Sequence, residues 1–255
     1  MKNTVVKKKY FFFFSFLLFL LHLPFSIAHA VITDGSGFTA RVPYKGFAIL
    51  NLDSFDELYD SLQLKITGLS RSAYDFAIAG WQYLLFNDSL RREHLLSVID
   101  FSLPSNRERL FVIDLLQRKL VFHTYVSHGQ GSGDLFARDF SNQPNSNKSS
   151  LGFYSTEETY IGRHGYSLKL KGLELGVNDL AAERSIVMHP ASYAGKTYLM
   201  RKGSLGRSHG CPAIPENISR SLINTIREGS CLFIYGPNSQ YLQRSLVLNP
   251  HLRSN

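Results

Sequence analysis

The spacing of apolar residues divides the chain into a helical part and a strand-rich part that meet near residue 96. Ala73, Phe76 and Ala77 stand three and four positions apart in the earlier part, which is the spacing of an amphipathic helix. Ser70 precedes this run, where its side chain can cap the first turn. We therefore expect the residues before the boundary to be mainly helical, with the longest helix following Ser70.

After the boundary the pattern changes to short strands. Residues 109–115 and 120–126 are rich in β-branched and aromatic side chains and are joined by a polar turn, which predicts an antiparallel hairpin. Further strands are predicted at 97–101, 151–154, 159–162, 167–170, 186–189 and 231–235, with one helix starting near Pro215. The expected fold is mainly β, an antiparallel β-sandwich or barrel-like domain with a few short helices, preceded by a small helical N-terminal segment.

The first thirty residues have the three-part pattern of a secretory signal peptide. Residues 1–9 contain four lysines and no acidic residue, and residues 10–23 are almost wholly apolar. Ala28 and Ala30 occupy the two positions that a signal peptidase reads. The apolar run is shorter than the roughly 20 residues that a membrane-spanning helix needs. We expect cleavage near Ala30, no integral membrane span in the mature form, and a periplasmic or secreted, cell-wall-associated location.

The charge of the mature chain gives little support for a nucleic-acid partner. The whole chain carries a net charge of +8 at pH 7, from 28 basic and 20 acidic residues. Four of the basic residues lie in the signal peptide, so the mature chain keeps 24 of them and a net charge of +4. No basic and aromatic array of the nucleic-acid-binding type is present. We expect no nucleic-acid partner.

The two cysteines stand in different surroundings. Cys231 opens the apolar run 231–235, a predicted buried strand in which a thiol behaves as a small hydrophobe. Cys211 follows Gly210 in a stretch rich in glycine and proline. A Cys211–Cys231 disulfide is the ordinary arrangement in an exported chain. The unlike surroundings favour instead one functional and one structural cysteine.

A cysteine nucleophile needs a base, because the thiolate is the reactive form and a free thiol is mostly protonated near neutral pH. The predicted strand 186–189 ends on His189, and Pro190 cannot extend the pairing. His209, two residues before Cys211, is a second candidate base or a cation that stabilises the thiolate. The residue types therefore suggest a cysteine acyl-transferase with Cys211 as nucleophile and His189 as base.

The loop before the cysteine supplies groups that can stabilise a reaction intermediate. Gly210 lets a substrate approach the backbone closely, and the amides of Gly210 and Cys211 can point at a developing oxyanion. Ser208 belongs to the same loop.

With these motifs the sequence resembles the L,D-transpeptidase (YkuD-like) catalytic domain family, in its murein L,D-transpeptidase branch. Members carry a histidine, a spacer and then Ser/Thr-His-Gly-Cys, which correspond here to His189 and Ser208-His209-Gly210-Cys211. The resemblance extends over roughly residues 97–236 and includes further matching segments at 99–102, 127–129, 140–142, 149–154, 165–168, 172–174, 178–179 and 206–207.

The resemblance implies a reaction on peptidoglycan stem peptides, as donor and acceptor. Cys211 would attack the carbonyl of the third residue, a diamino acid, and expel the terminal D-Ala. The thioacyl-enzyme would pass to an amine, giving a 3-3 cross-link, or to water, giving an L,D-carboxypeptidase. No metal or organic cofactor is required. Position in the matching segments makes five residues candidates for substrate binding: Ser149, Ser150, Tyr154, Tyr160 and Arg207.

This chain departs from the family pattern at two positions. Many relatives place an arginine or asparagine shortly after the cysteine, where this chain has Pro212 and Ala213. Pro190 stands where glycine is common after the base histidine. The residue that would hold a substrate carboxylate is therefore not identified by the motif.

The patterns and the resemblance together predict four segments. They are a signal peptide at 1–30, a helical N-terminal cap region at 31–96, an L,D-transpeptidase-like catalytic domain at 97–238 and a C-terminal surface tail at 239–255.

Two other classes of function stay open at the level of sequence. An exported zinc peptidase could draw its ligands from the histidines and Cys211, although no HExxH or similarly tight spacing is present. A cell-wall protein without enzymatic activity could hold Cys211 and Cys231 in a disulfide.

Overall fold

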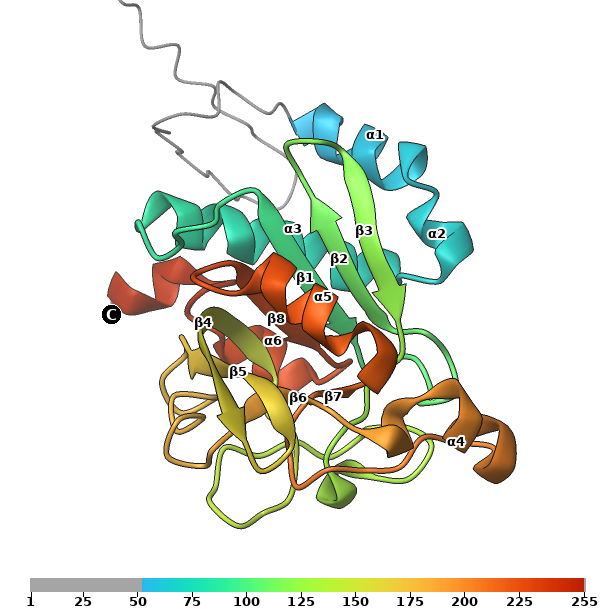
Figure 1. Cartoon of the computed structure of the whole chain (residues 1–255). Helices are drawn as coiled ribbons and strands as arrows, with labels where there is room; N and C mark the ends of the chain where they lie inside the picture. The colour runs from blue at the N-terminus through green and yellow to red at the C-terminus, as the bar shows by residue number, and fades with distance from the viewer. Residues whose placement is uncertain (1–51, 255) are drawn as a thin grey trace, which may run out of the picture. The chain divides into compact units, whose positions relative to one another are not determined.

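A computed structural model describes residues 52–254 (Figure 1). The predicted signal peptide and residues 31–51 of the predicted cap region lie outside the described residues. The helices are α1 (Leu52–Ser61), α2 (Leu64–Thr67), α3 (Arg71–Phe86), α4 (Lys196–Lys202), α5 (Glu216–Ile226) and α6 (Ser239–Arg244). Within the described part, none of the helices is long and apolar enough to cross a membrane.

Eight strands form one sheet in the order β3-β2-β1-β8-β4-β5-β6-β7. They are β1 (Leu95–Asp100), β2 (Leu110–Asp114), β3 (Lys119–Thr124), β4 (Gly152–Gly162), β5 (Gly165–Gly172), β6 (Val187–Pro190), β7 (Ala213–Ile214) and β8 (Cys231–Tyr235). Neighbouring strands are antiparallel except for the parallel pairs β1–β8 and β6–β7. The mainly β prediction and the β2–β3 hairpin are confirmed.

The sheet is nearly closed into a barrel at its two ends. Ser127, just beyond β3, forms an antiparallel bridge with Ala213 of β7. Gly129 forms a second, parallel bridge with Ser208. These two bridges bring the first and last strands of the sheet order together, and the segment that contains Cys211 lies where they meet.

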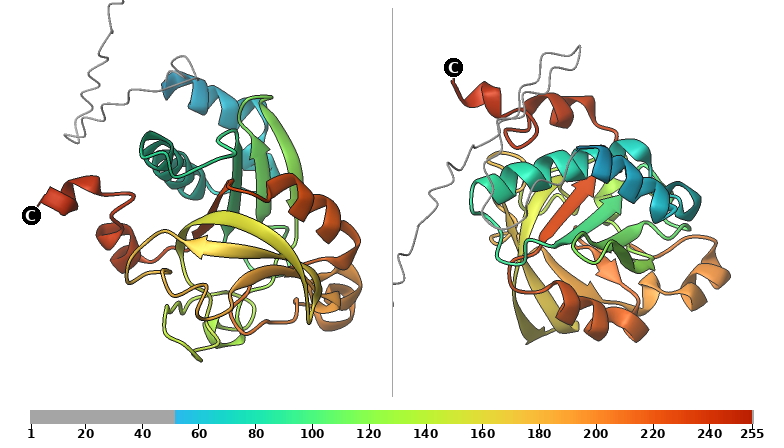
Figure 2. Two further views of the ribbon diagram at one scale, coloured as in Figure 1. Left: turned by 60° about the vertical axis from the view of Figure 1, so that its left-hand side comes forward. Right: turned by 90° about the horizontal axis from the view of Figure 1, so that it is seen from above.

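The centre of the sheet is buried on both faces. All residues of β1, β2 and β8 are buried. Burial on both faces is usual for parallel strands such as the β1–β8 pair, and here it extends to the antiparallel neighbour β2. α3 packs on β1 and β8, and α5 packs on β5 and β6. Figure 2 shows these two helices on opposite sides of the sheet. Cys231 is fully buried at the start of β8, as predicted.

The long helix α3 begins as its sequence predicts. The side chain of Ser70 accepts a hydrogen bond from the backbone N–H of Ala73, which caps the first turn. Ala73, Ala77 and Trp81 are buried and share one hydrophobic core with the strands. Residues 52–254 are therefore packed as part of one compact unit, although helices give way to strands at Leu95; the division into a cap region and a catalytic domain stays a prediction.

The contact between α3 and β4 depends on a glycine. A Cβ atom at Gly80 would lie 1.9 Å from Cζ of Phe153, far inside van der Waals contact. We expect Gly80→Ala to lower the free energy of unfolding by about 1–3 kcal/mol, the usual cost of an overfilled core, measured by chemical denaturation. In a double-mutant cycle, Phe153→Leu should relieve part of this cost. A more stable Gly80→Ala variant, as helix propensity alone predicts, would contradict the packing argument.

The C-terminal segment differs from the predicted surface tail. Residues 239–244 form α6, and Tyr241, Ser245 and Val247 are buried. The hydroxyl of Tyr241 donates to Oε1 of Glu174 at 3.0 Å, and the hydroxyl of Ser245 donates to the other carboxylate oxygen. Burial raises the pKa of Glu174, while these hydrogen bonds act in the opposite direction. The segment is therefore anchored to the core by these buried side chains, while residues such as Gln243 and Arg244 stay exposed.

Candidate active site

Cys211 lies beside the strand that carries His189. β6 and β7 pair in parallel, with His189 opposite Ala213, and the backbone N–H of His189 donates to the carbonyl of Pro212 at 3.4 Å. Cys211 immediately precedes Pro212, so the chain pairing brings the loop of the thiol next to the histidine. The sequence predicted these two residues from separate motifs, and the fold brings their backbones together.

The thiol of Cys211 has polar neighbours on both sides. Its Sγ accepts from the backbone N–H of Val187 at 3.5 Å and lies 3.6 Å from the carbonyl oxygen of Ser185, to which a neutral thiol can donate. Burial raises the pKa of Cys211, and the Val187 N–H and the charge of Arg184 lower it. Because burial is the largest of these effects, the thiol is protonated near neutral pH and needs a base.

His189 has the tautomer that a base requires. Its Nδ1 lies 2.9 Å from the carbonyl oxygen of Pro190, and since a carbonyl only accepts, we assign the proton to Nδ1 and the lone pair to Nε2. The side chain is 2% exposed, and burial lowers its pKa. Pro190, which stands where glycine is common in the family, thus supplies the carbonyl that orients the imidazole.

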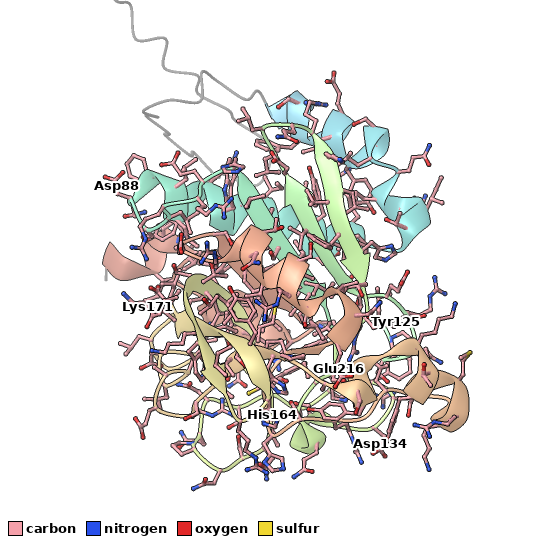
Figure 3. All side chains as sticks on the ribbon, in the orientation of Figure 1. Asp88, Tyr125, Asp134, His164, Lys171 and Glu216 are labelled. Atoms are coloured by element: carbon pink, nitrogen blue, oxygen red, sulfur yellow. The ribbon has the colours of Figure 1, made fainter. Side chains whose placement is uncertain are left out.

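A second histidine covers the ring of His189. His164 lies in the turn between β4 and β5, and the two imidazole rings stack with centroids 4.3 Å apart and planes at 23°. Figure 3 shows His164 at one end of this hairpin. The charge of His164 also lowers the pKa of His189, as a smaller effect than burial. No sequence motif pointed to this residue.

The loop before Cys211 is held by Ser208 and Gly210. Gly210 has φ +124°, and a Cβ there would lie 2.8 Å from the carbonyl oxygen of Lys148. Its N–H donates to Oγ of Ser208 at 3.1 Å, and that hydroxyl donates to the carbonyl of Cys211 at 2.6 Å. The amide of Gly210 is therefore already used, which contradicts its expected orientation toward an oxyanion. The amide of Cys211 makes no hydrogen bond within the described residues.

His209 differs from His189 in its surroundings. Its side chain is exposed, and no hydrogen bond joins it to another residue of the described chain. His189 is buried, oriented by a carbonyl and covered by a second ring. Of the two candidate bases, the geometry favours His189.

Arg184 is a residue near the thiol that sequence analysis missed. Its Nη2 lies 3.3 Å from the position that a Cβ on Gly210 would occupy, and its charge lowers the pKa of Cys211. The guanidinium also donates to four oxygen atoms of one loop, on Ser141, Ser146, Lys148 and Ser150. Arg184 therefore both fixes this loop and places a positive charge near the sulfur. Only its position five residues before His189 could have suggested it.

Three of the predicted substrate-binding residues are buried and support the loops instead. Ser149 and Ser150 are each 2% exposed, and Tyr154 is fully buried. Oγ of Ser149 accepts from the N–H of Gly129 and donates to the carbonyl of Gly210 at 3.2 Å. The Tyr154 hydroxyl donates to the carbonyl of Ser150. A role for these three in direct contact with substrate is therefore contradicted by their burial.

The other two candidates are exposed but lie in different places. Tyr160 pairs with Ser167 in the β4–β5 hairpin and carries Nζ of Lys169 over its ring at 5.9 Å. No described contact joins it to Cys211 or His189. Arg207 lines an open cavity of about 480 Å³ beside the segment that leads to Cys211.

The Ser127-His128-Gly129 segment has a structural explanation. Nη2 of the fully buried Arg109 lies 2.7 Å from Nδ1 of His128, whose Nε2 then donates to the carbonyl of Gly133 at 3.1 Å. Burial, with the charge of Arg109, lowers the pKa of His128 to about 4, so the imidazole is neutral at pH 7. It fixes the loop that follows.

The readings based on a disulfide or a metal receive no support from the described residues. Cys211 and Cys231 are both free thiols, so the predicted alternative of a disulfide between them is wrong for this structure. Among residues 52–254, no group of three or more His, Cys, Asp or Glu side chains is placed to hold a metal ion.

The mainly β fold, the free thiol and the oriented imidazole together define the class of a candidate cysteine-dependent enzyme. The sequence matches the L,D-transpeptidase catalytic domain family (YkuD_2) over residues 65–235, which is most of the chain. The protein therefore belongs to the L,D-transpeptidase catalytic domain family. The match begins within the predicted cap region, at α2, and ends with β8.

Solved structures that this chain resembles include L,D-transpeptidases and a cell shape determining protein. An L,D-transpeptidase from Mycobacterium smegmatis is 10% identical, with 56% of this chain and 59% of that one covered and a TM-score of 0.35. One from Xylanimonas cellulosilytica is 14% identical, covering 55% and 60%, with a TM-score of 0.32. The helical cell shape determining protein Pgp2 from Campylobacter jejuni is 12% identical, covering 63% and 54%, with a TM-score of 0.39.

These similarities are too weak to add to the family assignment. The chain spans about three fifths of the length of the first solved structures that it matches. A search of curated proteins found no match.

Proposed function

We propose that this protein is an exported cysteine acyl-transferase that acts on peptidoglycan stem peptides. The proposal is carried by the protonated thiol of Cys211 and the buried imidazole of His189 on the adjoining strand, whose Nδ1 is hydrogen-bonded to the Pro190 carbonyl. Nε2 is then the free basic nitrogen, as a general base requires. Family membership supports the substrate class.

The reaction divides into two acyl transfers. Nε2 of His189 takes the thiol proton while Sγ of Cys211 attacks the carbonyl carbon of the diamino acid. The C–N bond to the terminal D-Ala breaks, and the imidazolium passes its proton to the leaving amine. D-Ala departs with that proton, and His189 is neutral again. The N–H of Cys211, free within the described residues, is the amide available to the oxyanion. The charge of Arg184 stabilises the thiolate as it forms.

The second acyl transfer decides between two activities. An amine of another stem peptide would attack the thioester and give a 3-3 cross-link, whereas water would give an L,D-carboxypeptidase. Both acceptors use the same thioacyl-enzyme and the same base, so the residues around Cys211 fit either one.

Chromatography with mass detection on a tetrapeptide muropeptide tests the proposal. We expect release of D-Ala together with either a cross-linked dimer or a tripeptide, and the ratio of the two products identifies the acceptor. Absence of D-Ala release by the folded protein would contradict the proposal.

The proposal of export rests on the N-terminal sequence alone. The mass of the mature protein recovered outside the cytoplasm would test cleavage near Ala30.

The stacked pair of histidines predicts a pH effect. His189 acts as a base only when neutral, and a lowered pKa keeps it neutral to lower pH. Removing the charge of His164 with His164→Phe should raise the pKa of His189 and move the acidic limb of the kcat/KM profile to higher pH. His164→Ala also uncovers the ring, which weakens the effect of burial, so its shift should be larger and in the same direction.

The measurement is the profile of kcat/KM from about pH 4 to about pH 9, a range that spans the titration of histidine. A limb that stays in place in both variants, or moves to lower pH, would show that His164 does not influence the base.

A further inference from the structure

We propose that the cavity beside residues 206–211 is a subsite for a carboxylate of the stem peptide, with Lys202 as its anchor. This inference rests on the proposed function and names where the substrate is held. After the cysteine, this chain has Pro212 and Ala213 where many members of the family place an arginine or asparagine.

Among residues 52–254, no cation near Cys211 is available to hold a carboxylate from the position after the cysteine. Pro212 and Ala213 are apolar and buried. Arg184 is close to the thiol, but its guanidinium donates to the loop 141–150 and burial lowers its pKa. The cavity next to the catalytic loop contains two further cations, Lys202 and Arg207, and is open to a substrate carboxylate.

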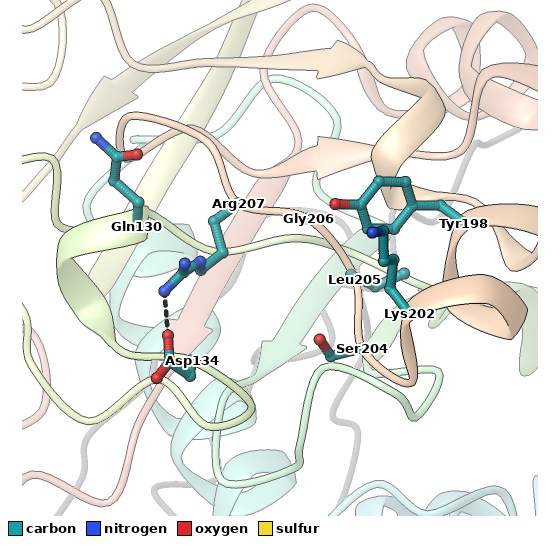
Figure 4. A pocket seen from close by; sticks show the side chains of 8 residues that line it. All are labelled: Gln130, Asp134, Tyr198, Lys202, Ser204, Leu205, Gly206 and Arg207. Carbon is teal, nitrogen blue, oxygen red and sulfur yellow. Dashed lines mark hydrogen bonds and ion pairs between the residues drawn. The ribbon is translucent and has the colours of Figure 1, made fainter.

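Three parts of the chain form the walls of the cavity (Figure 4). Its volume is about 480 Å³, and it is open to solvent. The lining residues come from the loop after Gly129, from α4 with its following turn, and from the segment that leads to Cys211; they are Gln130, Asp134, Tyr198, Lys202, Ser204, Leu205, Gly206 and Arg207. The elements come from distant parts of the sequence, and the bridge between Gly129 and Ser208 joins two of them.

The cavity adjoins the catalytic loop through close backbone contacts. A Cβ on Gly129, next to Gln130, would lie 2.9 Å from Cα of Gly210. On the other side, the N–H of Gly206 donates to the carbonyl of Tyr193 at 2.9 Å. The charge of Cys211 contributes to raising the pKa of Tyr193, after burial, as expected for a ring near the thiol. A peptide whose scissile bond lies at Cys211 can thus extend into the cavity.

The charges in the cavity favour an anion and point to Lys202. Arg207 forms an ion pair with Asp134 and also donates to the carbonyl of Gly133 at 3.1 Å. Lys202 forms no ion pair within the described residues. In Figure 4 the one carboxylate drawn, that of Asp134, faces Arg207 rather than Lys202. With two cations and one carboxylate, the lining carries a net charge of +1.

The wall opposite Lys202 is held by hydrogen bonds within the chain. His128 donates to the carbonyl of Gly133, which also accepts from Arg207. The N–H groups of Arg138 and Asp139 donate to the carbonyl of Ser132. A preformed wall lowers the entropy lost on binding, so a single free cation can select a carboxylate there.

Two carboxylates of a donor tetrapeptide could occupy the subsite, one on the terminal D-Ala and one on the side chain of the diamino acid. The test uses three peptides: the free acid, one amidated at the terminus and one amidated at the side chain. Binding is measured by NMR titration with Cys211→Ala, which prevents turnover, with and without Lys202→Met. Lys196→Met, at the other end of α4 and outside the cavity, is the matched control.

We expect Lys202→Met to weaken binding of the free acid about 3- to 10-fold, as for a partly exposed charged contact, and Lys196→Met to leave it unchanged. The peptide whose recognised carboxylate is amidated should bind weakly to the parent protein, and Lys202→Met should not lower its affinity further. The amidated position of that peptide identifies the carboxylate that Lys202 holds. Equal binding with and without Lys202→Met, or an equal loss for all three peptides, would overturn the subsite. Because binding is read without turnover, failure of the proposed reaction is seen separately, as absent D-Ala release by the wild type.

Discussion

Replacement of Cys211 by alanine is expected to lower the kcat of D-Ala release from a tetrapeptide by at least about 10³-fold. The reason is that Sγ alone can form the thioester, and the only other cysteine, Cys231, is fully buried in β8. The rate is measured by chromatography of released D-Ala at fixed enzyme concentration.

Cys231→Ala is the matched control for this loss. It removes the other thiol of the chain and should keep the activity at a temperature where the variant is folded, since Cys231 packs as an apolar side chain. A Cys211→Ala protein that retains the wild-type rate, or a folded Cys231→Ala protein that loses it, would assign the chemistry to a different residue.

His189→Ala should lower kcat/KM by about 10²- to 10⁴-fold, the usual range for a general base. Without Nε2, the reaction depends on spontaneous ionisation of Cys211, whose pKa burial holds above its ordinary value. The residual rate of the variant should therefore rise with pH through the alkaline range. Steady-state kinetics from neutral to alkaline pH, with circular dichroism to confirm folding, provide the measurement.

His209→Ala distinguishes the two candidate bases. Its side chain is exposed and makes no hydrogen bond within the described residues, so we expect a smaller loss than for His189→Ala. If His209→Ala lowers kcat/KM more than His189→Ala does, and His189→Ala keeps a near-normal pH profile, the base is His209.

The features that could be predicted from the sequence depend on short-range patterns. The cap at Ser70 and the β2–β3 hairpin each involve residues close together in the chain, so propensity and periodicity identify them. Cys231 was recognised as buried for the same reason, because its neighbours form an apolar run. The residues Cys211 and His189 were found through motifs, and β6–β7 pairing brings them together.

Long-range contacts account for what the sequence did not reveal. β1 pairs with β8 in parallel although more than 130 residues separate them, and no local signal distinguishes that pairing. Arg184 reaches the loop 141–150, and Ser245 reaches Glu174; neither contact has a periodic pattern. Position in a matching segment also does not report burial, which is why Ser149 and Tyr154 were expected to contact substrate.

His164 illustrates the same limit within the candidate site. It lies in a turn, exposed, and a single histidine there has no distinguishing sequence context. Its stacking on His189 follows from the position of the β4–β5 hairpin next to β6, through the antiparallel pairing of β5 with β6. Such a neighbour can be found only once the sheet order is known.

The central claim is that Cys211 is an acylated nucleophile, and intact mass spectrometry tests it most directly. The wild-type protein is incubated with a carbapenem, which carries a strained acyl group, and its mass is compared with that of Cys211→Ala. We predict one covalent adduct on the wild type, located by peptide mapping at Cys211, and none on the variant. An adduct that persists in Cys211→Ala, or a folded wild-type protein active on tetrapeptide that carries its acyl group elsewhere, would contradict the account.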